Sequence, residues 1–514
     1  MNSPLHLIPQ PKTVVRGSST VSLAATVSGD FMLLHDSLTD YVRRLFGITL
    51  SEEYSGAIRF TADSAFQGEA YALYAENGCA EIRAWTKDGA RNGMATLLQL
   101  LFVQNGTLCL PAVRIEDAPD CAFRSVMIDL ARDFHPFSYL LSYVDLCMLY
   151  KIPVLQLHFT DDQSYTLPSR LFPKLSTPGR HYTFAEIDAL NRYAASRGVH
   201  IMPEIDVPGH CRAFCQEYGD IFGKDGIITR TEQATTAMQQ LFCELCDMFP
   251  QSERIHIGGD EAAIAKWTED PACRDYALSQ GIDFDMEDKR LLAERLLADF
   301  VEKMAETVIS KGRIPMAWEG FSADVNDYVT RELQLMSWEN LYQTTPSLLE
   351  AGFNIVNSSW IPMYIVTPVA YWTQEEAFNW NTRTWGALHP ASPYHDKKLT
   401  VQDSPQIIGG QLLAWGDVIM EKYPNLEDGL SEERELVSQR APMLAENTWN
   451  KEKIRDYADI LEAYRETDRI RKELIKEFQN RKNFKNAARQ GGTNRRSLFT
   501  KNVSGGCLFF YTGA

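Results

Sequence analysis

Short apolar segments alternate with polar stretches along most of the chain, and the type of alternation changes near residue 118. Before that point, strand-like segments such as 57–61 and 79–84 are separated by turns. A helix is expected over about 88–102, because apolar residues recur there at intervals of three and four. Residues 1–118 are therefore predicted to form a small accessory α+β domain.

Beyond residue 118, eight strand-like apolar segments are separated by helical or loop segments. The expected strands are Ser125–Leu130, Val154–Thr160, His200–Ile205, Arg254–Ile257, Ile314–Trp318, Leu333–Trp338, Asn354–Trp360 and Ile407–Trp415. Strands that alternate with helices favour a parallel sheet, and eight of them suit a (β/α)8 barrel. A doubly wound open sheet is the alternative, but no glycine-rich phosphate-binding turn follows any of these strands. We predict an α/β fold with a (β/α)8 TIM barrel over residues 119–430.

The remaining residues, 431–514, are expected to form a helical C-terminal region. The charged run Lys451–Lys482 is interpreted as a solvated helix face rather than a binding surface. After it the composition shifts to Asn, Arg, Gly and Ser, and we expect a poorly ordered tail.

Composition and charge narrow the class of protein. The chain has 514 residues, 45% of them hydrophobic, which suits a soluble globular protein. Its net charge of -17 argues against a nucleic-acid partner and against docking on anionic lipid. No apolar segment is long enough to cross a bilayer, so membrane insertion is not expected. The oligomeric state stays open.

The first residues and the cysteines suggest a location and a redox state. Met1–His6 lacks a basic start followed by an apolar core, so we expect no secretory signal and a cytoplasmic protein. The ten cysteines are then expected to be reduced. The pairs Cys211/Cys215 and Cys243/Cys246 are interpreted as buried thiols, and no metal is predicted.

Polar and aromatic residues gather where the expected barrel strands end. In chain order they are Arg132, Asp161, Asp162, Asp206, His210, Asp260, Glu261, Trp318, Trp338, Trp360, Tyr364, Trp415 and Asp417. In a barrel of parallel strands all of these ends meet at one rim, where such folds carry their chemistry. The sequence therefore predicts a functional site at that rim.

The segment 254–262 carries the most specific chemistry. A buried strand is followed by Gly258 and Gly259, which allow close approach, and then by Asp260 and Glu261. Two adjacent and partly desolvated acids repel each other, so the pKa of one of them is expected to rise. Consecutive residues are badly placed to flank a sugar from opposite faces, as glycosidases with two working carboxyls require. They could act together if the nucleophile came from an N-acetyl group of the substrate, although the spacing alone does not establish this.

Several motifs together resemble one family of enzymes. The motif at 256–261, His-Ile-Gly-Gly-Asp-Glu, resembles the signature of family 20 glycoside hydrolases, the β-N-acetylhexosaminidases. Further motifs of the barrel and the accessory domain are similar to the family over roughly residues 5–450, at 128–132, 157–163, 203–210, 317–319, 337–339, 415–417, 7–11 and 96–100. The resemblance implies the same barrel and a hydrolase that needs neither a metal nor an organic cofactor.

The resemblance also implies catalytic roles. Glu261 would protonate the leaving oxygen and later activate water. Asp260 would accept the acetamide N–H and stabilise the developing positive charge. Tyr364 would donate its hydroxyl to the acetamide oxygen, and Asp161 with His210 would orient and tune Glu261.

Five further residues are implied to hold the sugar. Arg132 and Asp417 would bind its hydroxyl groups. Trp318, Trp338 and Trp415 would form the walls of the pocket around the acetamide methyl and the sugar ring.

The activity implied is exo-acting, retaining hydrolysis of terminal β-linked N-acetylhexosamine, through an oxazolinium intermediate. The partner would be a glycan or glycoconjugate with a terminal N-acetylhexosamine. Val366 stands where the family often has Asp, and Asp417 where it commonly has Glu, so the choice between gluco and galacto sugars stays open. Two alternatives are a related barrel hydrolase that releases a disaccharide and a non-catalytic amino-sugar-binding protein.

Overall fold

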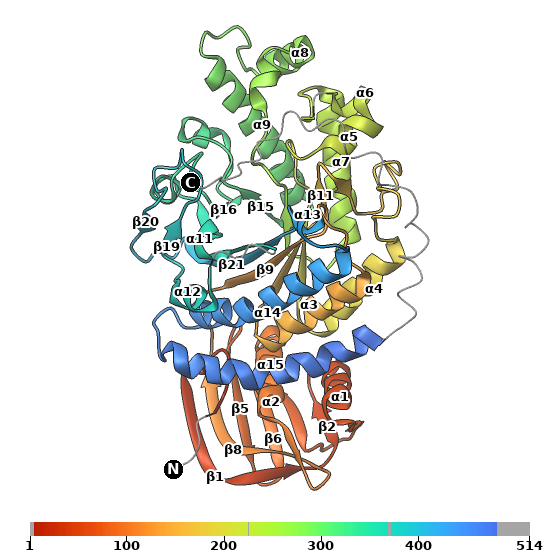
Figure 1. Cartoon of the computed structure of the whole chain (residues 1–514), viewed down its shortest axis with the longest axis vertical. Helices are drawn as coiled ribbons and strands as arrows, with labels where there is room; N and C mark the ends of the chain where they lie inside the picture. Colours follow the sequence, from red (N-terminus) through yellow and green to blue (C-terminus); the bar gives the residue numbers. More distant parts are fainter. Residues whose placement is uncertain (1–4, 225, 368–371, 481–514) are drawn as a thin grey trace.

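The computed structural model describes residues 5–224, 226–367 and 372–480. Figure 1 shows an N-terminal sheet at one end of the longest axis and the barrel next to it. The C-terminal helices run across the region where the sheet and the barrel meet. The predicted tail at 482–514 lies outside the described residues.

The N-terminal part is a mixed sheet in the order β1-β8-β5-β6-β4-β2-β3, with β7 paired to β8. The strands are β1 (Thr13–Leu23), β2 (Thr26–Gly29), β3 (Ser51–Glu52), β4 (Ile58–Ala62), β5 (Tyr71–Glu76), β6 (Cys79–Ala84), β7 (Phe102–Gln104) and β8 (Thr107–Asp117). Helices α1 (Met32–Phe46) and α2 (Lys87–Leu100) accompany this sheet. The expected helix at 88–102 is α2, which begins after Thr86 because the Thr86 hydroxyl accepts the N–H of Gly89.

The second part is a closed barrel of parallel strands. Its strands are β9 (Phe123–Asp129), β10 (Val154–His158), β13 (His200–Glu204), β14 (Arg254–His256), β15 (Ile314–Trp318), β16 (Gln334–Ser337), β17 (Asn354–Asn357) and β21 (Ile407–Trp415). Each strand pairs with the next, and β21 pairs with both β17 and β9, which closes the barrel. All eight predicted strands are present, so the (β/α)8 TIM barrel is confirmed and the open sheet is excluded.

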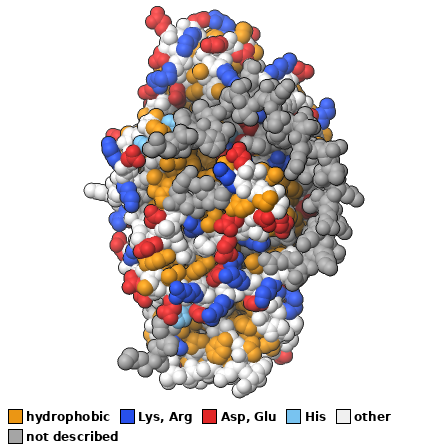
Figure 2. Space-filling model, viewed as in Figure 1, with side chains coloured by type: hydrophobic (Ala, Val, Ile, Leu, Met, Phe, Trp, Pro, Cys, Tyr) orange, Lys and Arg blue, Asp and Glu red, His pale blue; other side chains and the backbone are white. Residues whose placement is uncertain are grey.

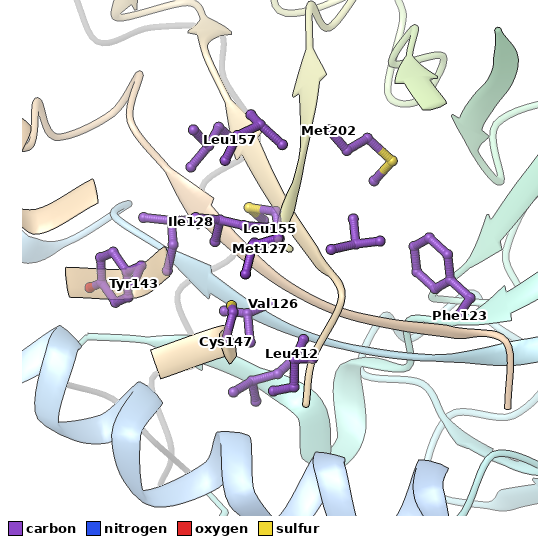
Figure 3. Packing of buried hydrophobic residues seen from close by; sticks show 14 of the residues in the cluster. Phe123, Val126, Met127, Ile128, Tyr143, Cys147, Leu155, Leu157, Met202 and Leu412 are labelled. Atoms are coloured by element: carbon purple, nitrogen blue, oxygen red, sulfur yellow. The ribbon is translucent and has the colours of Figure 1, made fainter. Parts of the chain in front are cut away.

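The outside of the barrel is apolar, because helices cover it. Figure 3 shows apolar side chains of the barrel strands together with Tyr143 and Cys147 of α3 (Phe137–Leu149). Two of the labelled side chains, Met127 and Met202, are in register with Gln156 and share its face of the sheet. The inside is partly polar: Gln411 of β21 donates to Oε1 of Gln156 of β10 over 2.6 Å, although β9 lies between these two strands. Both side chains must therefore point into the barrel.

Helices and short strands connect the barrel strands, and α13 follows the last of them. The helical segments are α4 (Phe184–Ser196), α5 (Arg212–Glu217), α6 (Gly219–Phe222), α7 (Glu232–Met248), η1 (Ile264–Thr268), α8 (Pro271–Ser279), α9 (Lys289–Ser310), η2 (Ala323–Tyr328), α10 (Thr345–Glu350), α11 (Trp360–Met363), α12 (Gln374–Asn379) and α13 (Ile419–Lys422). The short strands are β11 (Thr160–Asp161), β12 (Ser164–Tyr165), β18 (Tyr364–Val366), β19 (Thr384–Gly386) and β20 (Lys398–Thr400).

The C-terminal helices are α14 (Leu426–Trp449) and α15 (Tyr457–Asn480). Helix α15 exposes one charged face, as expected for this run, but buries Ile460 and Tyr464 on the other. It packs against α1 and α3 and so connects the N-terminal sheet with the barrel. Figure 2 shows acidic and basic side chains interspersed on the face along which this helix runs. Within the described ranges, no helix is long and apolar enough to cross a membrane.

Candidate active site

The C-terminal ends of the barrel strands bring the predicted site residues together. Each of the eight strands contributes at least one of them, and Trp318 and Trp415 are the last residues of β15 and β21. Ion pairs, ring contacts and electrostatic interactions link all ten residues into one cluster, which consists of Arg132, Asp161, His210, Asp260, Glu261, Trp318, Trp338, Tyr364, Trp415 and Asp417. We refer to this cluster as the rim cluster.

The turn after β14 separates the two consecutive acids. Gly258 and Gly259 have φ angles of +73° and +114°, and Glu261 has a φ of +48°. A Cβ atom on Gly258 would lie 2.0 Å from Oδ1 of Asp206, so glycine is required there by both conformation and space. As a result the Asp260 side chain is half-buried, whereas the Glu261 side chain is 55% exposed.

Asp260 lies in a desolvated and negatively charged environment. Burial, followed by the charge of Asp206, raises the pKa of Asp260 well above its usual range. One of its oxygens, Oδ1, is buried and has no hydrogen-bond partner among the residues that the structure describes. The sequence predicted a raised pKa for one acid of the pair, and the structure places that increase on Asp260. A hydrogen-bond donor or a positive charge on a ligand would offset the desolvation cost of this carboxyl.

His210 connects the exposed acid with buried charges. Its Nδ1 lies 3.3 Å from Oδ1 of Asp161, and its Nε2 lies 3.6 Å from Oε2 of Glu261. Burial lowers the pKa of His210, but the charges of Asp161 and Asp206 outweigh burial and raise it well above the usual value. An imidazolium therefore stands beside the Glu261 carboxyl and can orient it.

Arg132 is surrounded by carboxylates at the rim. Its guanidinium lies 2.9 Å from Asp161, 3.2 Å from Asp129 and 3.2 Å from Asp417. Burial raises the pKa of Asp161, but the charges of Arg132 and His210 hold it well below its usual range. Asp161 is therefore a fixed anion. Asp417 is 45% exposed, so part of its carboxylate faces the open mouth.

Aromatic side chains line one side of the cluster. The ring centroids of Trp318 and Trp415 are 6.1 Å apart, those of Trp415 and Tyr364 6.0 Å, and those of Tyr364 and Trp338 6.5 Å. Trp360, which was expected at the rim but was given no specific role, stacks on Tyr364 at 4.2 Å. This wall of rings can pack against an apolar ligand group or a sugar face.

Two glutamates of the rim were missed as site residues, although each follows a predicted tryptophan. Glu319 accepts hydrogen bonds from the backbone N–H groups of residues 340–342, and burial raises its pKa to about 8. Glu339 accepts from the N–H groups of residues 388–389, and burial raises its pKa to about 7. Both carboxyls anchor loops that follow the barrel strands. The repeated Trp-Glu pair is the signal in the sequence that could have identified them.

Two groups of side chains have the spacing of metal ligands. They are His158 with Glu204 and Asp206, and Asp206 with His210 and Asp260. The pKa of each histidine is raised because, although burial opposes it, neighbouring carboxylates favour the protonated ring. A metal would have to displace the proton from the ring, and we assign neither group to a metal. The absence of a metal or organic cofactor stays a prediction.

A closed barrel whose rim carries paired acids, an arginine among carboxylates and a wall of aromatic rings is typical of a carbohydrate-active enzyme. The comparison with known families gives the same class. The model described as glycosyl hydrolase family 20, catalytic domain, matches residues 121–452, and the model for domain 2 of that family matches residues 5–118. The chain belongs to glycosyl hydrolase family 20 and is a glycoside hydrolase.

Relatives of known name agree with this assignment. Beta-hexosaminidase subunit beta of Homo sapiens is 25% identical over 439 residues, which cover 82% of this chain and 72% of the relative. Beta-hexosaminidase of Vibrio furnissii is 25% identical over 462 residues, which cover 81% and 73%. In fold, the chain is similar to a GH20 exo β-N-acetylglucosaminidase of Vibrio harveyi solved with N-acetylglucosamine, with a TM-score of 0.75, 22% identity, and 91% and 77% of the two chains covered.

Proposed function

We propose that this hydrolase removes terminal, non-reducing β-linked GlcNAc or GalNAc from glycans or glycoconjugates, with retention of configuration. The observation that carries the proposal is the contrast between consecutive acids. Glu261 is exposed beside His210, whereas Asp260 has a buried oxygen to which no described residue donates a hydrogen bond. The names of the relatives support the substrate class, since they are beta-hexosaminidases.

In the first step the acetamido oxygen of the substrate attacks the anomeric carbon. The bond to the leaving oxygen breaks as Glu261 gives that oxygen a proton, and a cyclic oxazolinium forms. Asp260 accepts the acetamide N–H and faces the positive charge as it develops, which relieves the penalty that burial imposes on this carboxylate. Tyr364 donates its hydroxyl to the acetamide oxygen and aims it.

In the second step water attacks the anomeric carbon and opens the ring. Glu261, now ionised, takes a proton from that water, and the acetamide is restored. Two inversions at the same carbon give net retention. His210 and Asp161 keep the Glu261 carboxyl oriented through both steps.

The other rim residues hold the sugar in register for these steps. Arg132 and Asp417 offer matched donors and acceptors to its hydroxyl groups. The walls formed by Trp318, Trp338 and Trp415 enclose the acetamide methyl and the ring. A retaining enzyme with two carboxyls would instead need them about 5 Å apart on opposite faces of the sugar, which consecutive residues are badly placed to provide.

The test compares chromogenic β-GlcNAc, β-GalNAc and β-glucose conjugates with the purified protein. Cleavage of the N-acetyl sugars, but not of glucose, is expected, with the β-anomer of the free sugar as first product by NMR. Equal cleavage of glucose would contradict the mechanism. Sugar binding without cleavage would identify a non-catalytic binder, and release of a disaccharide alone from a chromogenic oligosaccharide would identify the other hydrolase activity.

A further inference from the structure

Glu204 is a carboxylate in the barrel interior that does not belong to the rim cluster, and the proposed mechanism does not use it. Glu204 is the last residue of β13 and is fully buried. We propose that Glu204 is a positioning residue that couples the acetamide wall to the acid, because it fixes Trp318 with one oxygen and His158 with the other. This inference rests on the proposed function of the rim cluster.

One carboxylate oxygen of Glu204 contacts the aromatic wall. The indole Nε1–H of Trp318 donates to Oε1 of Glu204 over 2.7 Å. A hydrogen bond to a charged acceptor is roughly twice as strong as a neutral one, so it holds the indole plane in one orientation. Trp318 packs in turn at 4.6 Å on the ring of His256 and at 6.1 Å on Trp415. The position of the wall therefore depends on this carboxylate.

The other carboxylate oxygen of Glu204 is connected to the acid, Glu261, through a series of charged side chains. Nδ1 of His158 lies 3.0 Å from Oε2 of Glu204, and Nε2 of His158 lies 3.1 Å from Oδ2 of Asp161. Nε2 makes a hydrogen bond to Asp161, and Nδ1 is at ion-pair distance from Glu204. Both neighbouring carboxylates favour the protonated ring. Oδ1 of Asp161 lies 3.3 Å from Nδ1 of His210, and Nε2 of His210 lies 3.6 Å from Oε2 of Glu261. A change at His158 therefore reaches Glu261 through these two contacts.

The charges around His158 and Glu204 explain why the two contacts of Glu204 depend on each other. Burial opposes a charge on His158, but Glu204 together with Asp161 and Asp129 keeps its pKa well above the usual value. Burial also opposes a charge on Glu204, and the charges of His158 and His256 hold its pKa well below the usual range. Loss of the Glu204 charge would therefore leave a buried cation without its compensating partner.

Glu204 also receives support from the barrel interior, and this support supplies a control. Gln156 donates to Oε2 of Glu204 over 2.8 Å, and Gln411 donates to Gln156. Gln411 touches no residue of the rim cluster in the described contacts. A change at Gln411 therefore removes a buried hydrogen bond from the same interior but leaves the bonds of Glu204 to Trp318 and His158 in place.

The experiment measures Glu204→Gln on a β-GlcNAc conjugate. The amide has one acceptor oxygen, so it cannot satisfy both Trp318 and His158, and His158 loses its second proton. We expect kcat/KM to fall by about tenfold or more, the scale known for carboxylates that orient functional side chains. The basic limb of the pH profile should move to higher pH, because a cation 3.1 Å from Asp161 is lost and the His210–Glu261 pair holds its proton more tightly.

Variants that remove only one of the two contacts of Glu204 separate the two effects. Trp318→Phe removes the indole N–H, so it should weaken binding of a thiazoline mimic of the cyclised intermediate and leave the pH profile in place. His158→Gln should move the pH profile and affect the thiazoline less. Glu204→Gln should show both changes, and Gln411→Met should show neither.

A Glu204→Gln variant that folds with the wild-type pH profile, or with wild-type affinity for the thiazoline, would overturn the proposal. If that variant does not fold, the double variant Trp318→Phe/His158→Gln tests whether the two contacts are coupled. We expect its loss in kcat/KM to differ from the product of the single losses by more than about threefold, and a simple product would overturn the coupling. The proposed function is tested separately, by wild-type cleavage of N-acetyl but not glucose conjugates.

Discussion

The Nε2 atom of His210 lies 3.6 Å from Oε2 of Glu261, and this pair links the exposed acid to the fixed anion Asp161. The neighbouring acid, Asp260, lies near Asp206 and His210, and its Oδ1 has no hydrogen-bond partner in the described part of the chain. One turn of backbone thus gives consecutive carboxyls different environments, and different environments allow different roles.

Glu261→Gln should lose about 10²–10⁴-fold in kcat/KM on substrates with poor leaving groups, because such groups need a proton from the acid. The loss should be much smaller on activated aryl glycosides, whose leaving groups depart without one. Steady-state kinetics on both substrate types measure this. Glu269→Gln, an exposed glutamate further along the same segment, is the control and should behave as wild type. Equal losses on both substrate types would rule out Glu261 as the acid.

Asp260→Asn should lower kcat/KM by about 10²–10³-fold on both substrate types, since the carboxylate stabilises the charge on the forming ring whatever the leaving group. The thiazoline mimic should also bind more weakly to this variant. Asp220→Asn, which changes an exposed carboxylate paired with Lys224, should leave both values unchanged. A loss confined to poor leaving groups would instead assign the proton donor to Asp260.

Gly258→Ala should distort the site and not merely strain the backbone. The added Cβ would lie 2.0 Å from Oδ1 and 2.6 Å from Cα of Asp206, so the turn that carries Asp260 and Glu261 must shift. A displacement of about 1 Å at reacting groups can cost about 10²-fold in rate. Gly106→Ala is the matched control, because its φ is +77° but the space around it is open. It should cost about 1 kcal/mol of stability and no activity. Equal activity of the two variants would contradict this account.

The fold was predictable to a large extent because its signal is local. Buried parallel strands appear as continuous apolar runs, and β9, β10 and β21 were found from such runs. The glycines at 258–259 were expected to allow close approach, and Gly258 does lie directly against Asp206. The ends of elements were less well defined: the segment Asn354–Trp360 was predicted as one strand, but β17 ends at Asn357 and α11 begins at Trp360.

The missed residues depend on contacts between distant segments. Glu204 and Glu319 are acids within or beside apolar runs, and their partners come from other strands and loops. A sequence shows that such an acid is unusual, but it does not show which N–H groups will face it. The raised pKa of Asp260 has the same origin, because it depends on burial and on the charge of Asp206, which follows the preceding strand.

Stability should fall as pH rises from about 5 to about 8. In the folded chain the pKa of Asp206 is raised to about 6, that of Glu339 to about 7 and that of Glu319 to about 8, in each case chiefly by burial. The folded state therefore binds more protons than the unfolded state in this window. Their contribution is complete below the unfolded pKa values and is lost as pH passes the folded ones.

Thermal unfolding of wild type across this pH range measures the effect. Glu319→Gln removes one of these groups and should flatten the dependence near pH 8. Glu306→Gln, an exposed glutamate on α9, should leave the dependence unchanged. A midpoint that rises from pH 5 to pH 8 in wild type would show that these carboxyls do not have raised pKa values.

The most direct test of the central claim varies the attacking group of the substrate itself. Fluorine atoms on the N-acetyl methyl withdraw electrons and weaken the carbonyl oxygen as a nucleophile, while the leaving group and the sugar ring stay the same. The measurement is kcat/KM for aryl GlcNAc conjugates with N-acetyl, N-fluoroacetyl, N-difluoroacetyl and N-trifluoroacetyl groups. We predict a steep fall with each added fluorine. A rate that does not change across the series would mean that the attacking atom belongs to the protein or to water, and would contradict the account.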